Sequence, residues 1–600
     1  MRTRSTVVWV VAVCLLLSGC TASTAESGLD KGATVTVASA AAFDSYNPAT
    51  TYGNSAANSS VAALTNDWFA SVDDTPKLVP DKRFGTSEIV SEDPLTVKYT
   101  VNAGVEWSDG TSVDAADLLL DWVANSRALD TPGFVPGDLA DPQTHEITAD
   151  LPPETVYFDS GAQPNTGLGL VHDVPTLSDD NRAITMVYTA PYADWQHVFP
   201  RALPAHVVGK NALGLRDNVE AKSAVIAAID SDNRGALSRL ASFWNSGFNF
   251  TELPHDPELL LSTGPYTISG MRAGESVTLT ANPQYTGSRK PSIETVVLRH
   301  IADPLAAAQA LGVGDVDVIA APATKPLRRA LANLDDVTTM AGSAGTYEHI
   351  DLQAAQSKSG VFADVRVRQA FMKVVPRRQI LDELVAPVAG DQAVLRDSQV
   401  FLPGTSGYAA SVTRNGSAAF ADVDVPGARA MLSEAGVTDP SVCILYESSN
   451  PRRVQEFRLI KESAAHAGFV VTDCGDANWR ELLGASNTYD AALYGWSTPS
   501  LAVSGPKAAF ATSGVNNHSF ISNREIDAVA ARLDTELNPT VQAQLQEKLD
   551  RLLWDHAYSM PLFDLPTVTA HSTRIDGVAP SLLAPHLEWN LPQWTVVDRP

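Results

Sequence analysis

Segments with the alternating pattern of a strand and segments with the spacing of a helix follow one another along this chain. Residues 95–101 alternate as a strand does, and after a turn a helix follows, with Asp114 among its N-cap candidates. The order returns later, where residues 442–446 and 469–472 flank a helical segment at 452–466. Interleaved strands and helices predict a mixed α/β fold.

The length of the chain favours several cores rather than one. A single hydrophobic core stops growing at roughly 250–300 residues, and this chain has 600 residues, of which 44% are hydrophobic. It carries 43 Lys and Arg against 69 Asp and Glu, a net charge of -26. Such an acidic surface argues against nucleic acid, or an anionic membrane bound through a basic face, as a partner.

The N-terminus has the features of a bacterial lipoprotein signal. Arginines precede an apolar stretch at 7–17, and the sequence Leu-Ser-Gly stands directly before Cys20. The apolar stretch is too short to span a bilayer as a helix, so we expect a removable signal peptide over residues 1–20. The alternative is a short anchor in which Cys20 is an incidental thiol.

Bacterial lipoproteins, which this pattern resembles, are cleaved before the cysteine and acylated on it. We therefore expect Cys20 to hold the protein at the outer face of the cell membrane, because two acyl chains suffice for stable attachment. Residues 21–33, rich in Ser, Thr, Ala and Gly, are then a flexible leash. The predicted location is extracytoplasmic.

Cys443 and Cys474 would remain in an oxidising compartment, where a disulfide is possible. The local pattern disfavours the bridge. Each cysteine borders a different predicted strand, and parallel neighbours would place the two residues at opposite strand ends, beyond the roughly 7 Å between Cα atoms that a disulfide allows. We therefore expect two unbridged cysteines and keep the disulfide as the alternative.

No motif of a nucleophilic, metal-dependent or nucleotide-dependent enzyme is present in the sequence. It contains no G-x-S-x-G, no H-E-x-x-H and no phosphate-binding loop. The twelve histidines are scattered, so each is better interpreted as a surface or core residue than as a metal ligand. The sequence thus predicts a protein that is not an enzyme and has no metal or cofactor, unless a site assembles from distant positions.

Five blocks of the sequence form a pattern that extends over most of the chain. They are the strand, Asp-Gly turn and capped helix at 78–117, the Gly-Pro-Tyr hairpin and Asn-Pro-Gln-Tyr turn at 263–285, the helix start at 364–370, the strand at 489–496, and residues 522–527 with 560–562. In this order they resemble the oligopeptide and dipeptide class of substrate-binding proteins of ABC importers, solute-binding family 5. Single blocks match by chance, whereas five in the family's order are specific.

The resemblance implies a two-lobed clamp of the periplasmic-binding-protein type with an extra subdomain. In such proteins the lobes enclose a ligand and close by a hinge motion. Lobe I would consist of residues 34–70, 255–300 and 565–600, with a subdomain inserted at 71–254. Lobe II would comprise residues 301–564.

Aromatic side chains and backbone groups of the inter-lobe cleft hold the ligand in this family. Aromatic rings offer a large contact area at little cost in rotamer entropy. The matching residues here are Phe43, Tyr46, Trp107, Tyr266, Tyr446, Trp479, Tyr494, Gly495, Trp496 and Ser497. Each of these side chains could instead pack in a core.

Other positions depart from the family pattern. Relatives that bind peptides carry an acidic residue where this chain has Pro499, and basic residues where it has Leu493, Ser486 and Asn487. A buried charge requires a partner, so we expect that the cargo is not a free short peptide bound by both termini. A longer or modified peptide, a glycoside, a siderophore and an envelope glycolipid all stay open.

The resemblance implies a lipid-anchored, monomeric receptor. It would capture a peptide-like or other bulky solute and deliver it to an ABC permease and its ATPase. Residues 191–207 also resemble segments of actinobacterial envelope lipoproteins of this fold, some of which are implicated in lipoglycan assembly. The alternative function is therefore a non-transporting envelope lipoprotein that binds a glycolipid or a protein partner.

Overall fold

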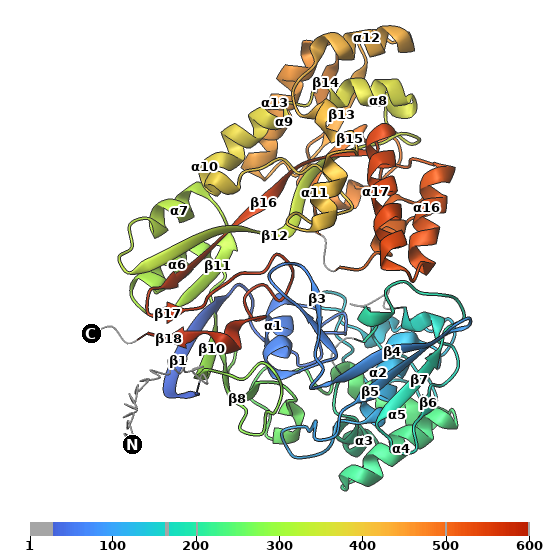
Figure 1. Ribbon diagram of the computed structural model, residues 1–600, viewed down its shortest axis with the longest axis vertical. Coiled ribbons are helices and arrows are strands. Elements are labelled where there is room, and N and C mark those ends of the chain that lie inside the picture. The colour runs from blue at the N-terminus through green and yellow to red at the C-terminus, as the bar shows by residue number, and fades with distance from the viewer. Residues whose placement is uncertain (1–27, 162–166, 200–201, 498–500, 598–600) are drawn as a thin grey trace, which may run out of the picture.

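The computed structural model describes residues 28–161, 167–199, 202–497 and 501–597. They form two lobes, which lie one above the other in Figure 1. The lower lobe contains the elements from Asp30 to His300 together with those after residue 574, and the upper lobe contains the elements from Pro304 to Ser572. The prediction of a two-lobed α/β clamp is confirmed.

One ten-stranded sheet runs through both lobes in the order β14-β13-β15-β12-β16-β11-β1-β10-β9-β8. The lobes are joined within it where β1 and β11 pair in parallel at Val37 and Val318. Its lower-lobe strands are β1 (Asp30–Ser39), β8 (Tyr266–Arg272), β9 (Ser276–Ala281) and β10 (Ile293–His300). Its upper-lobe strands are β11 (Val318–Pro322), β12 (Val337–Leu352), β13 (Ser441–Leu445), β14 (Val470–Asp473), β15 (Ala491–Ser497) and β16 (Ser559–Ser572).

The lower lobe has further strands and its own group of helices. A second sheet has the order β4-β5-β7-β6, and two short pairs accompany it. The strands are β2 (Ala70–Val72), β3 (Leu78–Pro80), β4 (Gly85–Glu92), β5 (Leu95–Val101), β6 (Thr176–Leu177), β7 (Ala183–Val187), β17 (Ile575–Asp576) and β18 (Thr595–Val596). The helices are α1 (Ala56–Thr65), α2 (Ala115–Ser126), α3 (Ala205–Leu213), α4 (Asn218–Asp230) and α5 (Arg234–Ser246).

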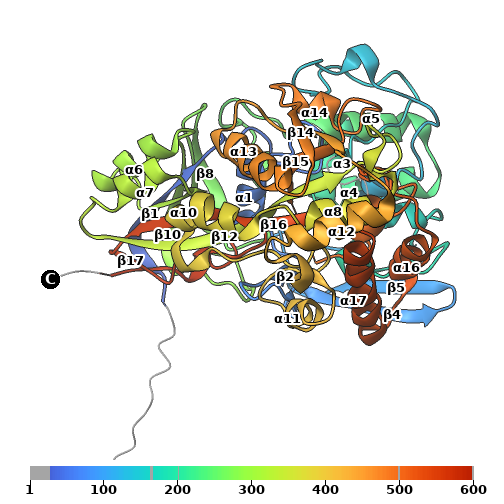
Figure 2. The ribbon, with the colours of Figure 1, turned by 90° about the horizontal axis from the view of Figure 1, so that it is seen from above.

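The helices of the upper lobe pack around its part of the sheet (Figure 2). They are α6 (Pro304–Gly312), α7 (Lys325–Leu331), α8 (Val365–Met372), α9 (Arg377–Ile380), α10 (Ala386–Ala389), α11 (Ser406–Val412), α12 (Val425–Ala435), α13 (Pro451–Ala465), α14 (Trp479–Leu482), α15 (Gly505–Phe510), α16 (Arg524–Thr535) and α17 (Pro539–Asp555).

Strand β1 begins earlier than the sequence suggests. Asp30 pairs with Ile293 of β10, and its N–H donates a hydrogen bond of 2.8 Å to the carbonyl of Ser292. Residues 30–33, which the sequence places in the leash, therefore belong to the sheet. They contain no β-branched or aromatic residue to mark a strand. Cys20 and the rest of residues 1–27 lie outside the described part of the chain.

Cys443 and Cys474 form a disulfide, so the expectation of two unbridged cysteines is wrong. Cys443 lies in β13 opposite Thr472 of β14, and Cys474 follows the last residue of β14. This register brings the two Cα atoms to 5.6 Å, inside the range for a bridge. The sequence pattern locates both strands but does not contain the register between them.

The motifs that carry the family resemblance join distant parts of the lower lobe. Asp109, in the Trp-Ser-Asp-Gly turn, lies 3.1 Å from the Nε2 atom of His206 in α3. Tyr285, in the Asn-Pro-Gln-Tyr turn, donates a hydrogen bond from its hydroxyl to Asp67. Both motifs thus fasten a turn to a segment far away in the sequence, which is a structural role.

Candidate functional site

A cavity of about 610 Å³ lies between the lobes, on the side of α2 and α16 in Figure 1. Its volume is within the range of roughly 300–1,000 Å³ that is usual for small-molecule sites. The lower lobe lines it with Asn125, Ser126, Arg127, Ser160, Gly167, Gly169, Leu170, Ala190, Pro191 and Tyr192. The upper lobe lines it with Ser504, Gly505, Lys507, Ala508, Ser513, Gly514, Val515, Asp534 and Thr535.

A short segment of the lower lobe is hydrogen-bonded to the upper lobe at the wall of this cavity. Asp194, only 3% exposed, accepts hydrogen bonds from the backbone N–H groups of Val503 (2.8 Å) and Ser504 (2.9 Å). Beside it, the N–H of Ala193 donates to the carbonyl of Asp534 at 2.7 Å. A carboxylate that accepts two N–H groups makes stronger hydrogen bonds than a neutral acceptor. These contacts hold the lobes together next to the cavity.

The charged side chains among the described lining residues are Arg127, Lys507 and Asp534. Lys507 and Asp534 form a salt bridge of 2.5 Å within the upper lobe. Burial raises the pKa of Asp534 above its ordinary value, although Lys507 opposes this shift. Most of the remaining lining residues are small, with serine hydroxyls and glycines on both sides. The wall therefore offers hydroxyl groups and few charges.

Several of the upper-lobe aromatic residues singled out by the resemblance do lie together. The ring centroids of Trp479 and Tyr494 are 6.0 Å apart, and Trp496 packs against the same small cluster. The Tyr494 hydroxyl donates a hydrogen bond to buried Asp351. Trp496 and Gly495 are partly exposed. The hollow that Tyr494 and Trp496 line has a volume of only about 20 Å³, which is room for little more than a water molecule.

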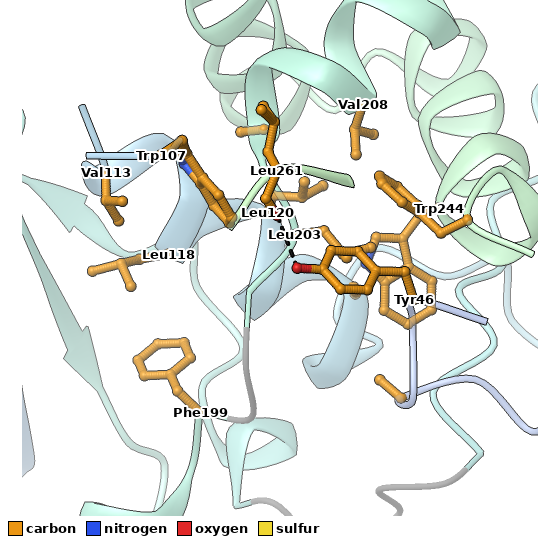
Figure 3. Close-up of a cluster of buried hydrophobic side chains, with 14 of the residues drawn as sticks. Tyr46, Trp107, Val113, Leu118, Leu120, Phe199, Leu203, Val208, Trp244 and Leu261 are labelled. Atoms are coloured by element: carbon orange, nitrogen blue, oxygen red, sulfur yellow. Dashed lines mark hydrogen bonds between the residues drawn. The ribbon is translucent and has the colours of Figure 1, made fainter. Parts of the chain in front are cut away.

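The remaining predicted aromatic residues are buried. Phe43, Tyr46, Trp107 and Tyr266 belong to the core of the lower lobe, part of which is drawn in Figure 3. Tyr46 donates a hydrogen bond of 2.9 Å from its hydroxyl to the carbonyl of Leu261, drawn as a dashed line. Tyr446 stacks on Phe457 in the upper lobe. We leave these five side chains out of the site proposed below, because in this structure they have packing roles.

The structure also locates three of the positions that depart from the peptide-binding pattern. Leu493 faces the core of the upper lobe and is fully buried. Ser486 and Asn487 both bind Gln356, through a side chain and a backbone N–H respectively. Exposed Ser497 has its Oγ 2.8 Å from that of Thr346. Pro499 lies outside the described residues.

Sequence reasoning missed the residues that line the cavity. Arg127, Lys507 and Asp534 lie in no motif, and the first and last of them are more than four hundred positions apart. Two lining residues, Pro191 and Tyr192, fall with Asp194 in the stretch 191–207, which the sequence marks only by its likeness to envelope lipoproteins. No local signal in the sequence marks these side chains, since tertiary structure alone brings them together.

Two general features concern only the described residues. They contain no group of three or more His, Cys, Asp or Glu side chains placed to hold a metal ion. Within the same part of the chain, none of the helices has the length and apolar character needed to cross a bilayer.

Two lobes joined through one sheet, with a cavity between them, define the clamp of a solute-binding protein. A profile described as "Bacterial extracellular solute-binding proteins, family 5 Middle" matches residues 80–517. The chain belongs to this family, which confirms the resemblance seen in the sequence blocks. Members of the family are the substrate-binding components of ABC importers.

Similar proteins support the assignment over nearly the whole chain. An uncharacterized lipoprotein of Mycobacterium tuberculosis, Rv2585c, is 25% identical over 581 residues, which cover 92% of each chain. The oligopeptide-binding protein OppA of the same species is 23% identical over 82% of this chain and 73% of its own length. The solved structure of the periplasmic EDTA-binding protein EppA has a TM-score of 0.73 at 19% identity, and covers 95% of this chain and 98% of that one.

Proposed function

We infer that this protein is the lipid-anchored solute receptor of an ABC importer and that its cargo occupies the cavity between α2 and α16. The observation that carries the proposal is the cavity, which residues of both lobes line. Beside it, Asp194 accepts hydrogen bonds from the backbone N–H groups at 503–504. A clamp that closes on a solute needs such contacts, since they form only when the lobes meet.

The relatives support a solute receptor but do not indicate one cargo. By their names, OppA binds oligopeptides and EppA binds EDTA, so closely similar folds take chemically different solutes. The extracytoplasmic location and the lipid on Cys20 are supported by the signal sequence and by relatives named lipoproteins. We further propose that the receptor is monomeric and hands its cargo to a permease and ATPase.

Capture of a solute tests the proposal. The purified mature protein is incubated with a small-molecule extract of cells and growth medium, washed, and denatured, and the released compounds are identified by mass spectrometry. We expect one or a few compounds to be retained. Asp194→Asn should release them roughly tenfold faster or more, because it removes a charge from two hydrogen bonds across the lobes. Retention of no compound by the wild-type protein would contradict the proposal.

The alternative is a non-transporting envelope lipoprotein, and the departures at Leu493, Ser486 and Asn487 favour it, since they remove charges that peptide receptors use. Deletion of the gene discriminates between the two functions. Loss of uptake of the retained solute is expected for a receptor. Normal uptake with an altered glycolipid profile is expected for the alternative.

Attachment through Cys20 is tested separately. Cys20→Ala removes the acylated sulfur, so the protein should move from the membrane fraction to the soluble fraction, and labelled palmitate should no longer be incorporated. Unchanged membrane association of this variant would count against the lipid anchor.

A further inference from the structure

Arg127 occupies an unusual backbone position at the edge of the cavity. It is the C-cap of α2 and has φ 58° and ψ 15°, in the left-handed region. Glycine is the residue that favours this conformation at a helix end, because a Cβ atom makes it strained. In this chain the position is held by an arginine, whose long cationic side chain is exposed and lines the cavity.

The guanidinium of Arg127 has one hydrogen bond to the described residues. Its Nε donates a hydrogen bond of 3.3 Å to the hydroxyl of Ser160, and among the described residues it forms no salt bridge. The internal segments outside the described residues, at 162–166, 200–201 and 498–500, contain no Asp or Glu. Most of the hydrogen-bonding capacity of this planar group is therefore open to whatever enters the cavity.

Neither Asp159, next to Ser160, nor Asp130 forms a salt bridge with Arg127, and both accept hydrogen bonds from other residues. Asp159 accepts hydrogen bonds from the backbone N–H (3.0 Å) and hydroxyl (2.7 Å) of Thr51. Asp130 accepts one of 3.2 Å from the N–H of Phe158. On the facing wall, the charge of Lys507 is balanced by Asp534. Burial raises the pKa of Asp130 to about 6, and the charge of Arg127 only partly opposes this shift. Among the described residues of the cavity wall, Arg127 is thus the cation that no carboxylate holds in a salt bridge.

We propose that Arg127 binds an oxyanion of the cargo, so that the solute is a small organic molecule carrying a carboxylate or a phosphate. The inference rests on the proposed function. A guanidinium presents parallel N–H groups that match the two oxygens of such an anion. The hydrogen bond to Ser160 uses the Nε atom of the guanidinium, so its two terminal nitrogens stay available to the cargo. The cation comes from the lower lobe, whereas peptide-binding relatives place their charges at positions that hold Leu493, Ser486 and Asn487 here.

The test compares variants at Arg127 with a matched arginine elsewhere. Wild type, Arg127→Gln, Arg127→Gly and Arg239→Gln are each used to capture solutes from the extract, and the affinity for the retained compound is then measured by calorimetry. Arg239 is exposed on α5 and is not part of the cavity wall. We expect a retained compound with a carboxylate or phosphate, bound roughly 10- to 100-fold more weakly by both Arg127 variants and equally well by Arg239→Gln.

Arg127→Gly separates binding from folding. Glycine relieves the left-handed backbone, so this variant should melt at the same temperature as the wild type or a higher one, and yet bind weakly. If the retained compound is a carboxylic acid, its methyl ester should bind the wild-type protein and Arg127→Gln with equal affinity. If ester formation has no effect while removal of a phosphate group weakens binding, the anion is a phosphate.

Two results overturn the inference and leave the receptor function standing. One is a retained solute that is uncharged or purely cationic. The other is an anionic solute that Arg127→Gln and Arg127→Gly bind as tightly as the wild type does. Failure of the wild-type protein to retain any solute would instead count against the proposed function itself.

Discussion

The two lobes differ in how their hydrophobic cores are built. The lower lobe has one continuous hydrophobic core that extends from β1 to Trp594, whereas the buried apolar residues of the upper lobe fall into four separate clusters. Both lobes contain buried ion pairs, Lys222 with Asp117 in the lower lobe and Arg453 with Glu348 in the upper lobe, but the disulfide lies in the upper lobe. A covalent link therefore supplements the smaller apolar clusters of the upper lobe.

Trp107→Ala is expected to have the largest effect, and to act on the lower lobe. Trp107 is 1% exposed, and loss of a buried aromatic side chain costs about 3–5 kcal/mol. Chemical denaturation gives the free energy of unfolding, and hydrogen exchange shows which lobe opens. Exchange should rise in β5 and α2 more than in β13. Val135→Ala, at an exposed position of the same lobe, should change the free energy by less than about 0.5 kcal/mol.

Removal of the disulfide should weaken the upper lobe almost as much. Cys443 and Cys474 are separated by 31 positions, and closing a loop of that length stabilises a fold by about 3.5 kcal/mol in the chain-entropy account. The double variant Cys443→Ala/Cys474→Ala should show faster hydrogen exchange in β13 and β14 but not in β5. Reduction of the wild type should reproduce the effect, and an unchanged melting temperature after reduction would contradict it.

Glu348→Gln tests the buried ion pair of the upper lobe, with a smaller expected effect. Glu348 is fully buried and accepts hydrogen bonds of 2.8 Å from both Arg452 and Arg453. Burial favours its neutral form, but the two arginines outweigh burial and hold the pKa of Glu348 below its ordinary value. Each arginine retains another carboxylate, so we expect a loss of about 2–3 kcal/mol, confined to the upper lobe in hydrogen exchange.

The pH dependence of stability provides a further test in the lower lobe, measured as a slope rather than as a single loss. Burial raises the pKa of Asp121 in α2 to about 8. Between the unfolded pKa of roughly 3.9 and this value the folded state binds one more proton than the unfolded state, so stability falls as pH rises. The slope from this group is at most about 1.4 kcal/mol per pH unit. Asp121→Asn should remove it, whereas Asp138→Asn, at an exposed position, should not.

The sequence predicted much of the fold because local chemistry determines many of its elements. β5 has the predicted bounds, and Asp114 caps α2 as expected. A strand alternates and a helix needs a cap, and both signals lie within a few residues. The start of β1 and the disulfide were missed because each depends on pairing with a distant strand.

The candidate site was much harder to predict from the sequence than the fold. The motif blocks predicted aromatic ligand-binding residues, and several of these, such as Trp107 and Tyr266, are packed in the core. The cavity wall instead depends on Arg127, Ser160 and Lys507, which share no pattern in the sequence. Motifs recur across a family because they build its shape, whereas residues that contact the cargo vary with the cargo.

The position of β1 determines how the protein would be oriented at a membrane if Cys20 carried a lipid. β1 and β18 lie on one side of the protein and α2 and α16 on the other in Figure 1, and Figure 2 also shows β1 and α16 on opposite sides. The ten peptide units between Cys20 and Asp30 can reach at most about 35 Å when fully extended. A lipid on Cys20 would therefore hold the lower lobe by its β1 edge, close to the bilayer and away from the cavity. The upper lobe could then move relative to the lower lobe without displacing the lipid attachment. Delivery to a membrane partner would require the whole protein to rotate about that attachment.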